Sequence, residues 1–187
     1  MEARNQWQEL QKKIDTGKLK FLDESSIDTG MTPIYGWGNK DERVKDSVPT
    51  TGVKRTSIIS TLSKNGFEAT MTFPGTLDQD VFKVYIEKCL VPTLKSGDIV
   101  VMDNSPVHRT NDILLPIYGA KAEVLFLPPY SPDFNPIEMA WSKMKTMLRK
   151  LKARTSTDLD KALTDALQYV TKDDIVNYFS QDGYLCI

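Results

Sequence analysis

The chain has 187 residues, of which 40% are hydrophobic and 26% are charged, and its formal net charge is −1. These values match an average soluble globular protein and exclude a collagen, a chain disordered throughout and a small disulfide-stapled scaffold. Because the chain is not basic overall, binding of nucleic acid would require a local patch of positive charge.

The first quarter of the chain contains short ordered segments and one long irregular segment. Residues 2–15 carry apolar side chains at three- and four-residue spacing, which predicts a short helix. The apolar run at 19–22 predicts a strand that ends at Asp23. Residues 28–55 contain six Gly and Pro residues, and this density predicts a projecting loop rather than sheet core.

The middle of the chain predicts a hairpin, a helix and a buried strand. Two strands, 56–62 and 67–73, are separated by a Lys-Asn-Gly turn with the chemistry of a hairpin. Residues 78–90 have an apolar helical face. Residues 98–102 then form an apolar strand that runs into Asp103.

The second half predicts more helix than strand. A weaker helix follows His108, residues 123–127 form another buried strand, and the proline-rich residues 128–133 exclude regular structure. Asn135 and Pro136 open a long helix, with the asparagine side chain as its N-cap. Two further helices fit 157–170 and 172–180.

This order of elements predicts an α/β fold with a mixed five-stranded sheet, flanked by helices and followed by C-terminal helices. We divide the chain into an N-terminal helical lead-in, residues 1–17, and one domain, residues 18–187. Cys89 and Cys186 lack metal-ligand spacing, which favours a reducing compartment. The polar N-terminus predicts no signal peptide, and no apolar run is long enough for a membrane span.

Three carboxylates stand at the ends of predicted elements. Asp23 ends the first strand, Asp103 ends the most apolar strand, and Glu138 lies in the first turn of the long helix. Strand ends at one edge of a sheet converge, and a helix that starts across this edge adds a third carboxylate. Such oxygen ligands suit Mg²⁺ or Mn²⁺. Two ions about 3.5–4 Å apart can activate the attacking oxygen and stabilise the leaving oxygen in phosphoryl transfer.

Each acid also has a purely structural interpretation. Asp23 and Asp103 are each followed by residues that fit an Asx turn. Glu138 stands three residues after Asn135, which is the spacing of a capping box. An acid directly after an Ile-Val-Val-Met run is costly unless it is used, and the pattern alone leaves both interpretations open.

The long helix carries an apolar stripe beside a basic one. Five residues at helical spacing predict its buried face: Ile137, Trp141, Met144, Leu148 and Leu151. Lys145, Arg149 and Lys152 share the adjacent flank with Glu138, and we expect them to guide DNA toward it. A solvated helix end has a similar composition. Three further cations are expected to project away from Glu138: Lys143, Lys150 and Arg154.

His108 is the only histidine and follows Asp103 by five residues. A lone histidine is more often a helix-start or surface residue, but this one would lie near the loop after Asp103, where it can act behind the metal ligands. We place Asn104 and Asn135 in the same supporting group. The chain has no P-loop, no Gly-x-Ser-x-Gly elbow and no Cys-x-x-Cys motif.

Three segments carry a resemblance to a known family. They are Phe-Leu-Asp-Glu at 21–24, Val-Met-Asp-Asn-Ser-Pro-Val-His at 101–108, and Leu-Pro-Pro-Tyr-Ser-Pro-Asp-Phe-Asn-Pro-Ile-Glu at 127–138. They resemble the catalytic core of DDE transposases of the mariner superfamily, in its bacterial insertion-sequence branch. The third segment is highly specific, and the 34 residues between Asp103 and Glu138 are typical of that superfamily.

The resemblance covers about residues 18–184 and implies a ribonuclease H-like fold. It implies that Asp23, Asp103 and Glu138 are the catalytic metal ligands and that two Mg²⁺ or Mn²⁺ ions are the cofactor. The implied reaction is cut-and-paste transposition of an insertion sequence. Water attacks the phosphodiester bond at the element end, and the freed 3′-hydroxyl then attacks target DNA, commonly at a TA dinucleotide.

The resemblance also implies partners and a location. It implies DNA binding by a homodimer, in which the insertion between the first two strands contacts the second protomer. It implies the bacterial cytoplasm, and the nucleoid when DNA is bound. Proteins of this superfamily usually carry helix-turn-helix modules before the core, and the 22 residues before Asp23 are too few for one. We therefore expect a separately encoded helix-turn-helix part or a truncated copy.

Two other functions remain open at this point. A ribonuclease H-like nuclease would use the same acids to hydrolyse nucleic acid without strand transfer. A truncated and inactive transposase remnant would instead act as a regulator. Joining of a supplied 3′-hydroxyl to target DNA separates the transposase from both.

Overall fold

A computed structural model of the chain describes residues 2–184; Cys186 and the end of the predicted domain, residues 185–187, lie outside the described part. The strands are β1 (Leu19–Asp28), β2 (Arg55–Ser63), β3 (Gly66–Phe73), β4 (Ile99–Met102) and β5 (Glu123–Phe126). The α-helices are α1 (Glu2–Gln11), α2 (Gln79–Tyr85), α3 (Asn111–Gly119), α4 (Ile137–Leu151), α5 (Ser156–Gln168) and α6 (Lys172–Gln181). In the described residues, no helix is long and apolar enough to cross a membrane.

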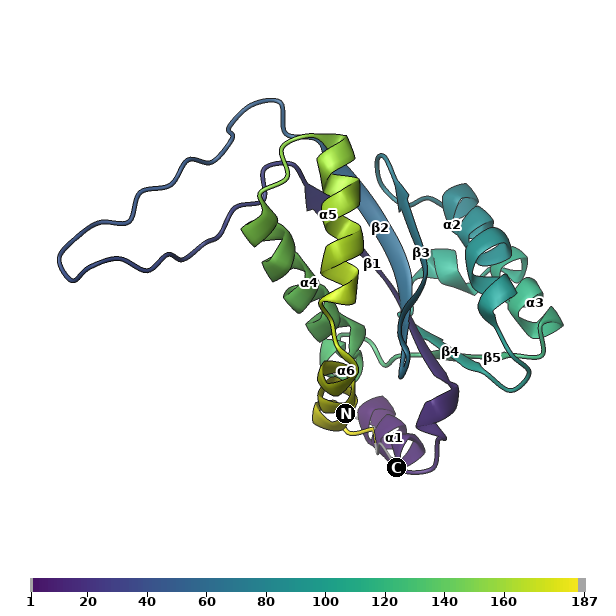
Figure 1. Ribbon diagram of the computed structural model, residues 1–187. Coiled ribbons are helices and arrows are strands. Elements are labelled where there is room, and N and C mark those ends of the chain that lie inside the picture. The colour runs from purple at the N-terminus through teal and green to yellow at the C-terminus, as the bar shows by residue number, and fades with distance from the viewer. Residues whose placement is uncertain (1, 185–187) are drawn as a thin grey trace.

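The strands form one mixed sheet in the order β3-β2-β1-β4-β5 (Figure 1), which confirms the predicted five-stranded sheet. β1 pairs antiparallel with β2 and parallel with β4, and β4 pairs parallel with β5. The last parallel pair of β1 and β4 is Phe21 with Val101. Asp23 and Asp103 each follow this last pair by two positions, at the point where the two strands separate.

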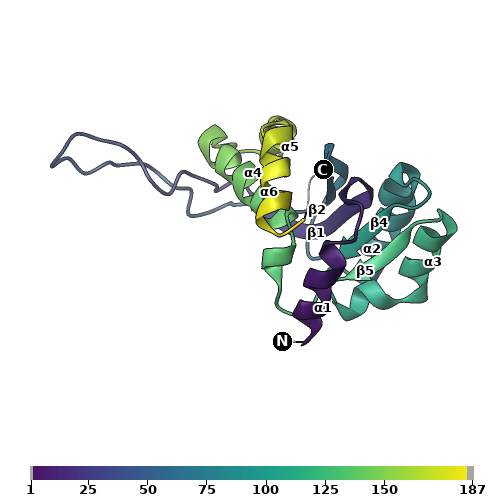
Figure 2. The same ribbon diagram turned by 90° about the horizontal axis from the view of Figure 1, so that it is seen from below.

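Helices cover both faces of the sheet. α4, α5 and α6 lie on one face, and α2 and α3 lie on the other (Figures 1 and 2). The first core contains Phe21, Trp141 and Phe179, and it also takes in Trp7 of α1. The second core contains Leu22, Phe82 and Ile113. Adjacent residues of β1 enter different cores because side chains alternate along a strand.

β1 is longer than the sequence predicts. The strand does not end at Asp23 but continues to Asp28, because antiparallel pairing with β2 extends from Phe21–Leu62 to Asp28–Arg55. This pairing satisfies the backbone of the polar Glu-Ser-Ser run that looked like a turn. The Asx-turn interpretation of Asp23 is therefore wrong, although Asp23 still lies just beyond the end of the pairing with β4.

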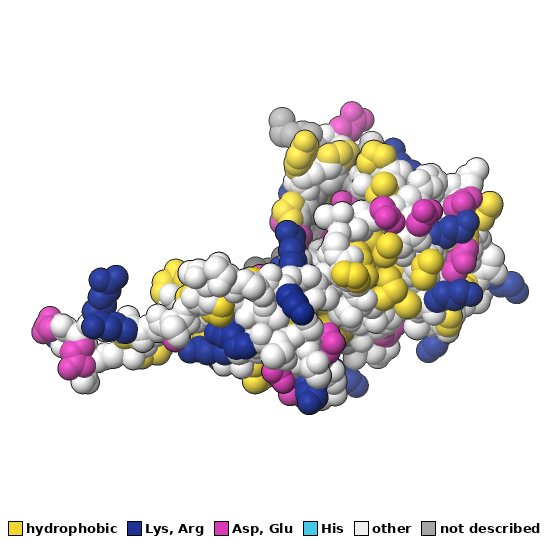
Figure 3. Space-filling model, turned by 90° about the horizontal axis from the view of Figure 1, so that it is seen from above, with side chains coloured by type: hydrophobic (Ala, Val, Ile, Leu, Met, Phe, Trp, Pro, Cys, Tyr) yellow, Lys and Arg dark blue, Asp and Glu magenta, His cyan; other side chains and the backbone are white. Residues whose placement is uncertain are grey.

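Residues 29–54 form a long loop that projects away from the body of the molecule (Figure 1), as predicted for 28–55. Side chains of both charges gather at its tip (Figure 3). Arg154 ties down its base, because the guanidinium donates hydrogen bonds to the carbonyls of Thr29 and Met31 at 3.0 and 2.9 Å. The loop nevertheless leaves Trp37 fully exposed.

α4 begins and ends differently from the prediction. Its N-cap position is Pro136 and has no side-chain hydrogen bond, so the expected Asn135 cap and the capping box with Glu138 are wrong. The helix ends at Leu151, and Lys152 follows in the left-handed region at φ 48°. Four members of the predicted stripe are buried, but Leu151 is 40% exposed because it lies in the last turn.

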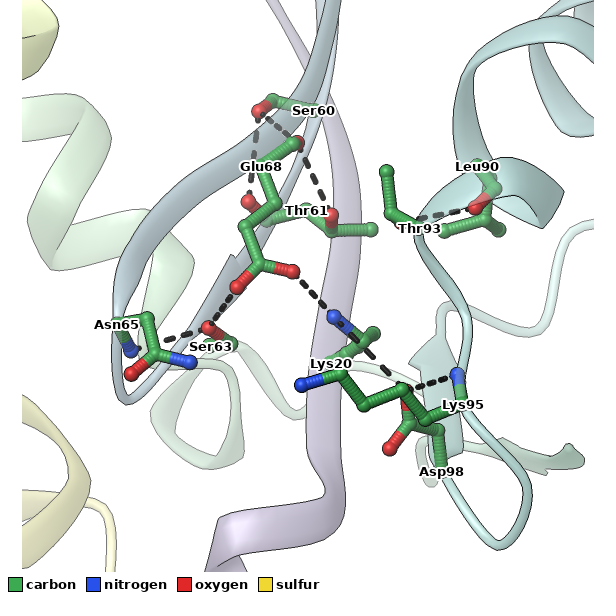
Figure 4. Close-up of polar contacts among 10 residues, drawn as sticks. All are labelled: Lys20, Ser60, Thr61, Ser63, Asn65, Glu68, Leu90, Thr93, Lys95 and Asp98. Atoms are coloured by element: carbon green, nitrogen blue, oxygen red, sulfur yellow. Dashed lines mark hydrogen bonds and ion pairs between the residues drawn. The ribbon is translucent and has the colours of Figure 1, made fainter.

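A buried ion cluster connects β1, β3 and the residue before β4, near the first residues of β1 and β4 (Figure 4). Lys20 of β1 forms an ion pair with Glu68 of β3 and lies 3.9 Å from a carboxylate oxygen of Asp98, just before β4. The hydroxyls of Ser60 and Thr61 donate to the carbonyl of Glu68. The register of β2 and β3 shifts at this point, so these contacts fix a β-bulge.

Candidate active site

Asp23, Asp103 and Glu138 line one cavity of about 540 Å³. The remaining wall comes from residues 104–105, residues 127–132 and Asn135. Among the described residues that line it, none is Lys, Arg or His. The structure thus brings the three predicted acids together in an electronegative hollow that extends beyond the parallel strand ends to the start of α4.

Asp23 lies near two other carboxylates, those of Glu138 and Glu24. Its Oδ2 accepts a hydrogen bond from Nε1 of Trp141 at 3.1 Å. Burial raises the pKa of the Asp23 carboxyl to about 8, and the negative charges of Glu138 and Glu24 add to this effect. A cation bound between Asp23 and Glu138, which line the same cavity, would relieve their repulsion.

Asp103 follows β4 and serves two purposes. Its Oδ1 accepts a hydrogen bond from the backbone N–H of Ser105 at 3.0 Å, so the Asx-turn interpretation is correct for this residue. The same oxygen lies 2.6 Å from Nδ1 of His108. The contact with His108 holds the pKa of Asp103 below its usual value. Its side chain remains 58% exposed and faces the cavity.

His108 is buried, contrary to the surface interpretation, and lies in a 3-10 turn just before α3. Its Nε2 lies 3.1 Å from Oε1 of Glu24, and its ring packs on Phe82 with centroids 4.4 Å apart. Burial alone would lower the pKa of His108, but Asp103 and Glu24 outweigh it and raise the pKa to about 9. The imidazolium therefore links the loop after β4 to the central strand.

Glu24 and Trp141 are two further parts of this site that the sequence pattern does not predict. Glu24 lies in the Phe-Leu-Asp-Glu segment and in a predicted turn, but alternation along β1 turns it to the face opposite Asp23, where it meets His108. Trp141 was assigned to the core alone. It stands three residues after Glu138, on the same side of α4, and this spacing was the signal that could have placed it beside the acids.

Asn104 and Asn135, predicted to support the metal ligands, also line the cavity. The Oδ1 atom of each is buried and has no hydrogen-bond partner within the described residues. With the carboxylates they form an oxygen-only donor set, which suits Mg²⁺ or Mn²⁺. No three His, Cys, Asp or Glu residues in the described part already form a cluster that could hold one ion. The donor chemistry fits the ion, and the three acids line one cavity without forming a ready-made single-ion cluster.

The three predicted DNA-binding cations do not stay together. Lys145 lines a groove next to the acids, together with Glu24, Arg55 and Ser57. Arg149 lines a separate hollow under the base of the projecting loop. The shared flank is wrong for Lys152, which lies beyond the end of α4 and forms an ion pair with Asp46 of the loop at 2.6 Å.

Two of the three cations expected to project away from Glu138 contact other elements of the fold. Lys143 forms an ion pair with Asp174 of α6, and Arg154 binds the base of the loop. Lys150 is exposed and lines the same hollow under the projecting loop as Arg149. The basic composition of this segment therefore reflects contacts between elements as well as charge available to a partner.

Comparisons with known proteins agree on one family. A family model described as DDE superfamily endonuclease matches residues 18–160. The Tcb1 transposase of a transposable element in Caenorhabditis briggsae is 28% identical over 83 residues, which are 42% of this chain and 30% of that protein.

Solved structures share the fold. The Mos1 transposase paired-end complex with the left transposon end has a TM-score of 0.78 at 14% identity, over 97% of this chain and 57% of that one. The catalytic domain of Mos1 mariner transposase has a TM-score of 0.65 at 15% identity, over 100% of this chain and 93% of that one. These matches confirm the ribonuclease H-like fold. The chain spans less than two thirds of the longer relatives.

Proposed function

The chain belongs to the family of DDE superfamily endonucleases, and we propose that it is the catalytic core of a mariner-type transposase. In this proposal it cuts DNA at the end of a transposable element and joins the freed 3′-hydroxyl to target DNA. The single observation that carries the proposal is the convergence of Asp23, Asp103 and Glu138 on one cavity.

Asp23, Asp103 and Glu138 would hold two divalent ions, with Asn104 and Asn135 as neighbouring oxygen donors. When bound, such ions activate an attacking oxygen and stabilise the leaving one. The Mos1 paired-end complexes include one with Mn and one with Mg, which supports this choice of ions. The number of ions is an inference from the reaction class.

The residues behind the acids position them. Trp141 fixes one oxygen of Asp23, so the carboxylate keeps its orientation as α4 packs on β1. His108 joins Asp103 to Glu24 across the two strands. Such outer contacts orient ligands and commonly change metal affinity by about 10–100-fold when they are removed.

DNA would approach along the groove beside the cavity. Lys145 and Arg55 supply positive charge there, and Ser25, Ser26 and Ser57 supply hydroxyl groups. Phosphate backbones are typically bound by such cations and hydroxyls. The similar Mos1 structures include a strand transfer complex and a paired-end complex with the left transposon end, which supports DNA as the substrate.

We further propose a homodimer in which the loop over residues 29–54 contacts the second protomer. Its exposed apolar side chains, such as Tyr35 and Trp37, support this role. The bacterial insertion-sequence branch, the TA target and the separate helix-turn-helix part are proposals that rest on the sequence resemblance alone. The bacterial cytoplasm is the location proposed with them.

A strand-joining assay tests the proposal. A labelled duplex with a free 3′-hydroxyl is incubated with the full chain, Mg²⁺ and a plasmid rich in TA dinucleotides. We expect the label to become covalently attached to the plasmid, and we expect no attachment with the Asp103→Asn variant. Cleavage of the plasmid without attachment would instead favour the nuclease. Neither reaction, from a folded protein that binds DNA, would favour the inactive remnant.

A further inference from the structure

Tyr130 is an aromatic side chain whose placement no step above explains. It lies in the proline-rich loop that forms one wall of the active-site cavity. The residue is 100% exposed, and its backbone has φ 53°, in the left-handed region. A bulky residue other than glycine seldom adopts this conformation, which costs roughly 1–2 kcal/mol. A strained backbone that presents a bare aromatic ring at the rim of a catalytic cavity indicates a role in binding.

The loop around Tyr130 is held in place. Ser131 is buried, and its hydroxyl donates to the carbonyl of Pro129 at 3.2 Å. Arg4 of α1 donates to Oγ of Ser131 at 2.8 Å and to Oδ1 of Asp133 at 2.9 Å. Because both flanks of the tyrosine are fixed, its projection into solvent is a property of the loop rather than of a mobile segment.

The charge of the cavity explains what such a ring can do. Three carboxylates face the cavity, and among its described lining residues there is no cation. The phosphates of a DNA strand find no ionic partner there before metal ions bind. Contacts that carry no charge must therefore help to hold the strand beside the acids, and Tyr130 is the one aromatic residue among those lining residues.

We propose that Tyr130 is a stacking platform for an unpaired nucleobase of the DNA strand that enters the cavity. The inference rests on the proposed DNA-cutting function and names a further binding residue for it. A base can reach the ring face only when it is unstacked from its duplex, so the platform selects DNA that is melted or single-stranded next to the acids. Stacking of this kind tolerates any base, because every base has a π face.

Binding of two DNA probes tests the proposal. The first is a duplex with a single-stranded 3′ overhang that contains 2-aminopurine, and the second is the same duplex fully paired. Both are titrated with the full chain in Ca²⁺. For the overhang probe, we expect Tyr130→Asn to weaken binding about 5- to 100-fold and to remove the quenching of 2-aminopurine. Asparagine is chosen because it tolerates the left-handed backbone.

Two further variants make the test specific. Tyr130→Phe retains the ring and should bind the overhang probe like the wild type. Tyr118→Asn removes a half-exposed tyrosine from α3, away from the cavity, and should bind like the wild type as well. The paired duplex should bind all of these proteins within about twofold of one another.

Equal loss of binding to both probes, wild-type quenching in Tyr130→Asn, or a loss in Tyr130→Phe as large as in Tyr130→Asn would each overturn the proposal. Plasmid nicking in Mg²⁺, measured in parallel, separates it from the proposed function. Ring-dependent binding by a protein that never nicks DNA would count against the function alone. Nicking without ring-dependent binding would count against the stacking platform alone.

Discussion

Nε1 of Trp141 donates a hydrogen bond of 3.1 Å to Oδ2 of Asp23, and this bond joins α4 directly to the central strand of the sheet. Trp141 is buried in the core through the rest of its ring. One side chain therefore belongs both to the hydrophobic core and to the candidate active site. Packing of α4 on the sheet and orientation of the Asp23 carboxylate are coupled through it.

Replacing Trp141 by Phe should keep an aromatic ring in the core but remove the donor to Asp23. We expect the Mg²⁺ concentration for half-maximal plasmid nicking to rise about 10-fold, as for other residues that orient metal ligands. We also expect a stability loss of about 1–3 kcal/mol from the smaller ring. Nicking rates across a Mg²⁺ series and urea unfolding measure the two effects.

Trp7→Phe is the matched control. Trp7 is also buried, its Nε1 donates to the hydroxyl of Tyr184 at 3.1 Å, and Trp7 is not among the residues that line the cavity of the three acids. This variant should lose similar stability without a change in Mg²⁺ dependence. An equal change in Mg²⁺ dependence in the two variants would mean that the bond to Asp23 has no special role.

Lys145→Ala should weaken DNA binding and lower its salt dependence. Lys145 lies in the groove beside Glu138, and burial lowers the pKa of its amine. One lost phosphate contact should reduce the slope of log affinity against log salt by about one unit. The measurement is binding of a fluorescent duplex over a range of NaCl concentrations.

The control for Lys145 must be a cation with no structural contact. Lys143 and Arg154 are unsuitable because each fixes another part of the fold. Lys161 is exposed on α5, so Lys161→Ala should leave the slope unchanged. If both variants lower the slope equally, the position of the positive charge does not matter, and the groove is not the path of the DNA.

Asp182 should make the stability of the protein depend on pH. Burial and the charge of Asp133 raise the pKa of Asp182 to about 7. The folded state therefore holds this proton more tightly than the unfolded state does. Stability from this group is present below the ordinary pKa near 4 and is lost as the pH rises through about 7.

Asp182→Asn should remove this dependence. The variant should match the wild type in urea unfolding at pH 4 and exceed its stability at pH 8 by about 1–2 kcal/mol, a figure discounted for solvent screening. Asp160→Asn, at an exposed position of α5, should leave the profile unchanged. The assignment would be refuted if the difference in unfolding free energy between the wild type and Asp182→Asn were the same at pH 5 and at pH 8.

Local sequence patterns predicted most helices and strands, because each of these elements has its own apolar periodicity or is bounded by recognisable turn residues. The Ile-Val-Val-Met run became β4 and placed Asp103 at its end, and the stripe from Ile137 to Leu148 became the buried face of α4. The polar end of β1 was not predictable in this way. Its polar residues are strand residues only because β2, from another part of the chain, pairs with them.

The supporting residues of the site depend on the same kind of distant contact. His108 meets Glu24, which is 84 residues earlier, and Lys152 meets Asp46, which is 106 residues earlier. No spacing rule connects such positions. The sequence therefore identified the three acids that share the cavity. The contact that orients Asp103 and the ion pair that takes Lys152 away from the basic flank could be seen only in the folded structure.

The most direct test of the central claim is Mg²⁺-dependent nicking of a supercoiled plasmid by single-acid variants whose folding is checked in parallel. Asp23→Asn, Asp103→Asn and Glu138→Gln should each lose nearly all nicking. Asp23→Asn should unfold at a urea concentration at least as high as the wild type, because it replaces a carboxyl whose charged form is disfavoured by burial and by Glu138 and Glu24. Asp112→Asn, at an exposed ion pair of α3 with Lys83, should nick normally. Nicking at the wild-type rate by a folded Asp103→Asn protein would contradict the account.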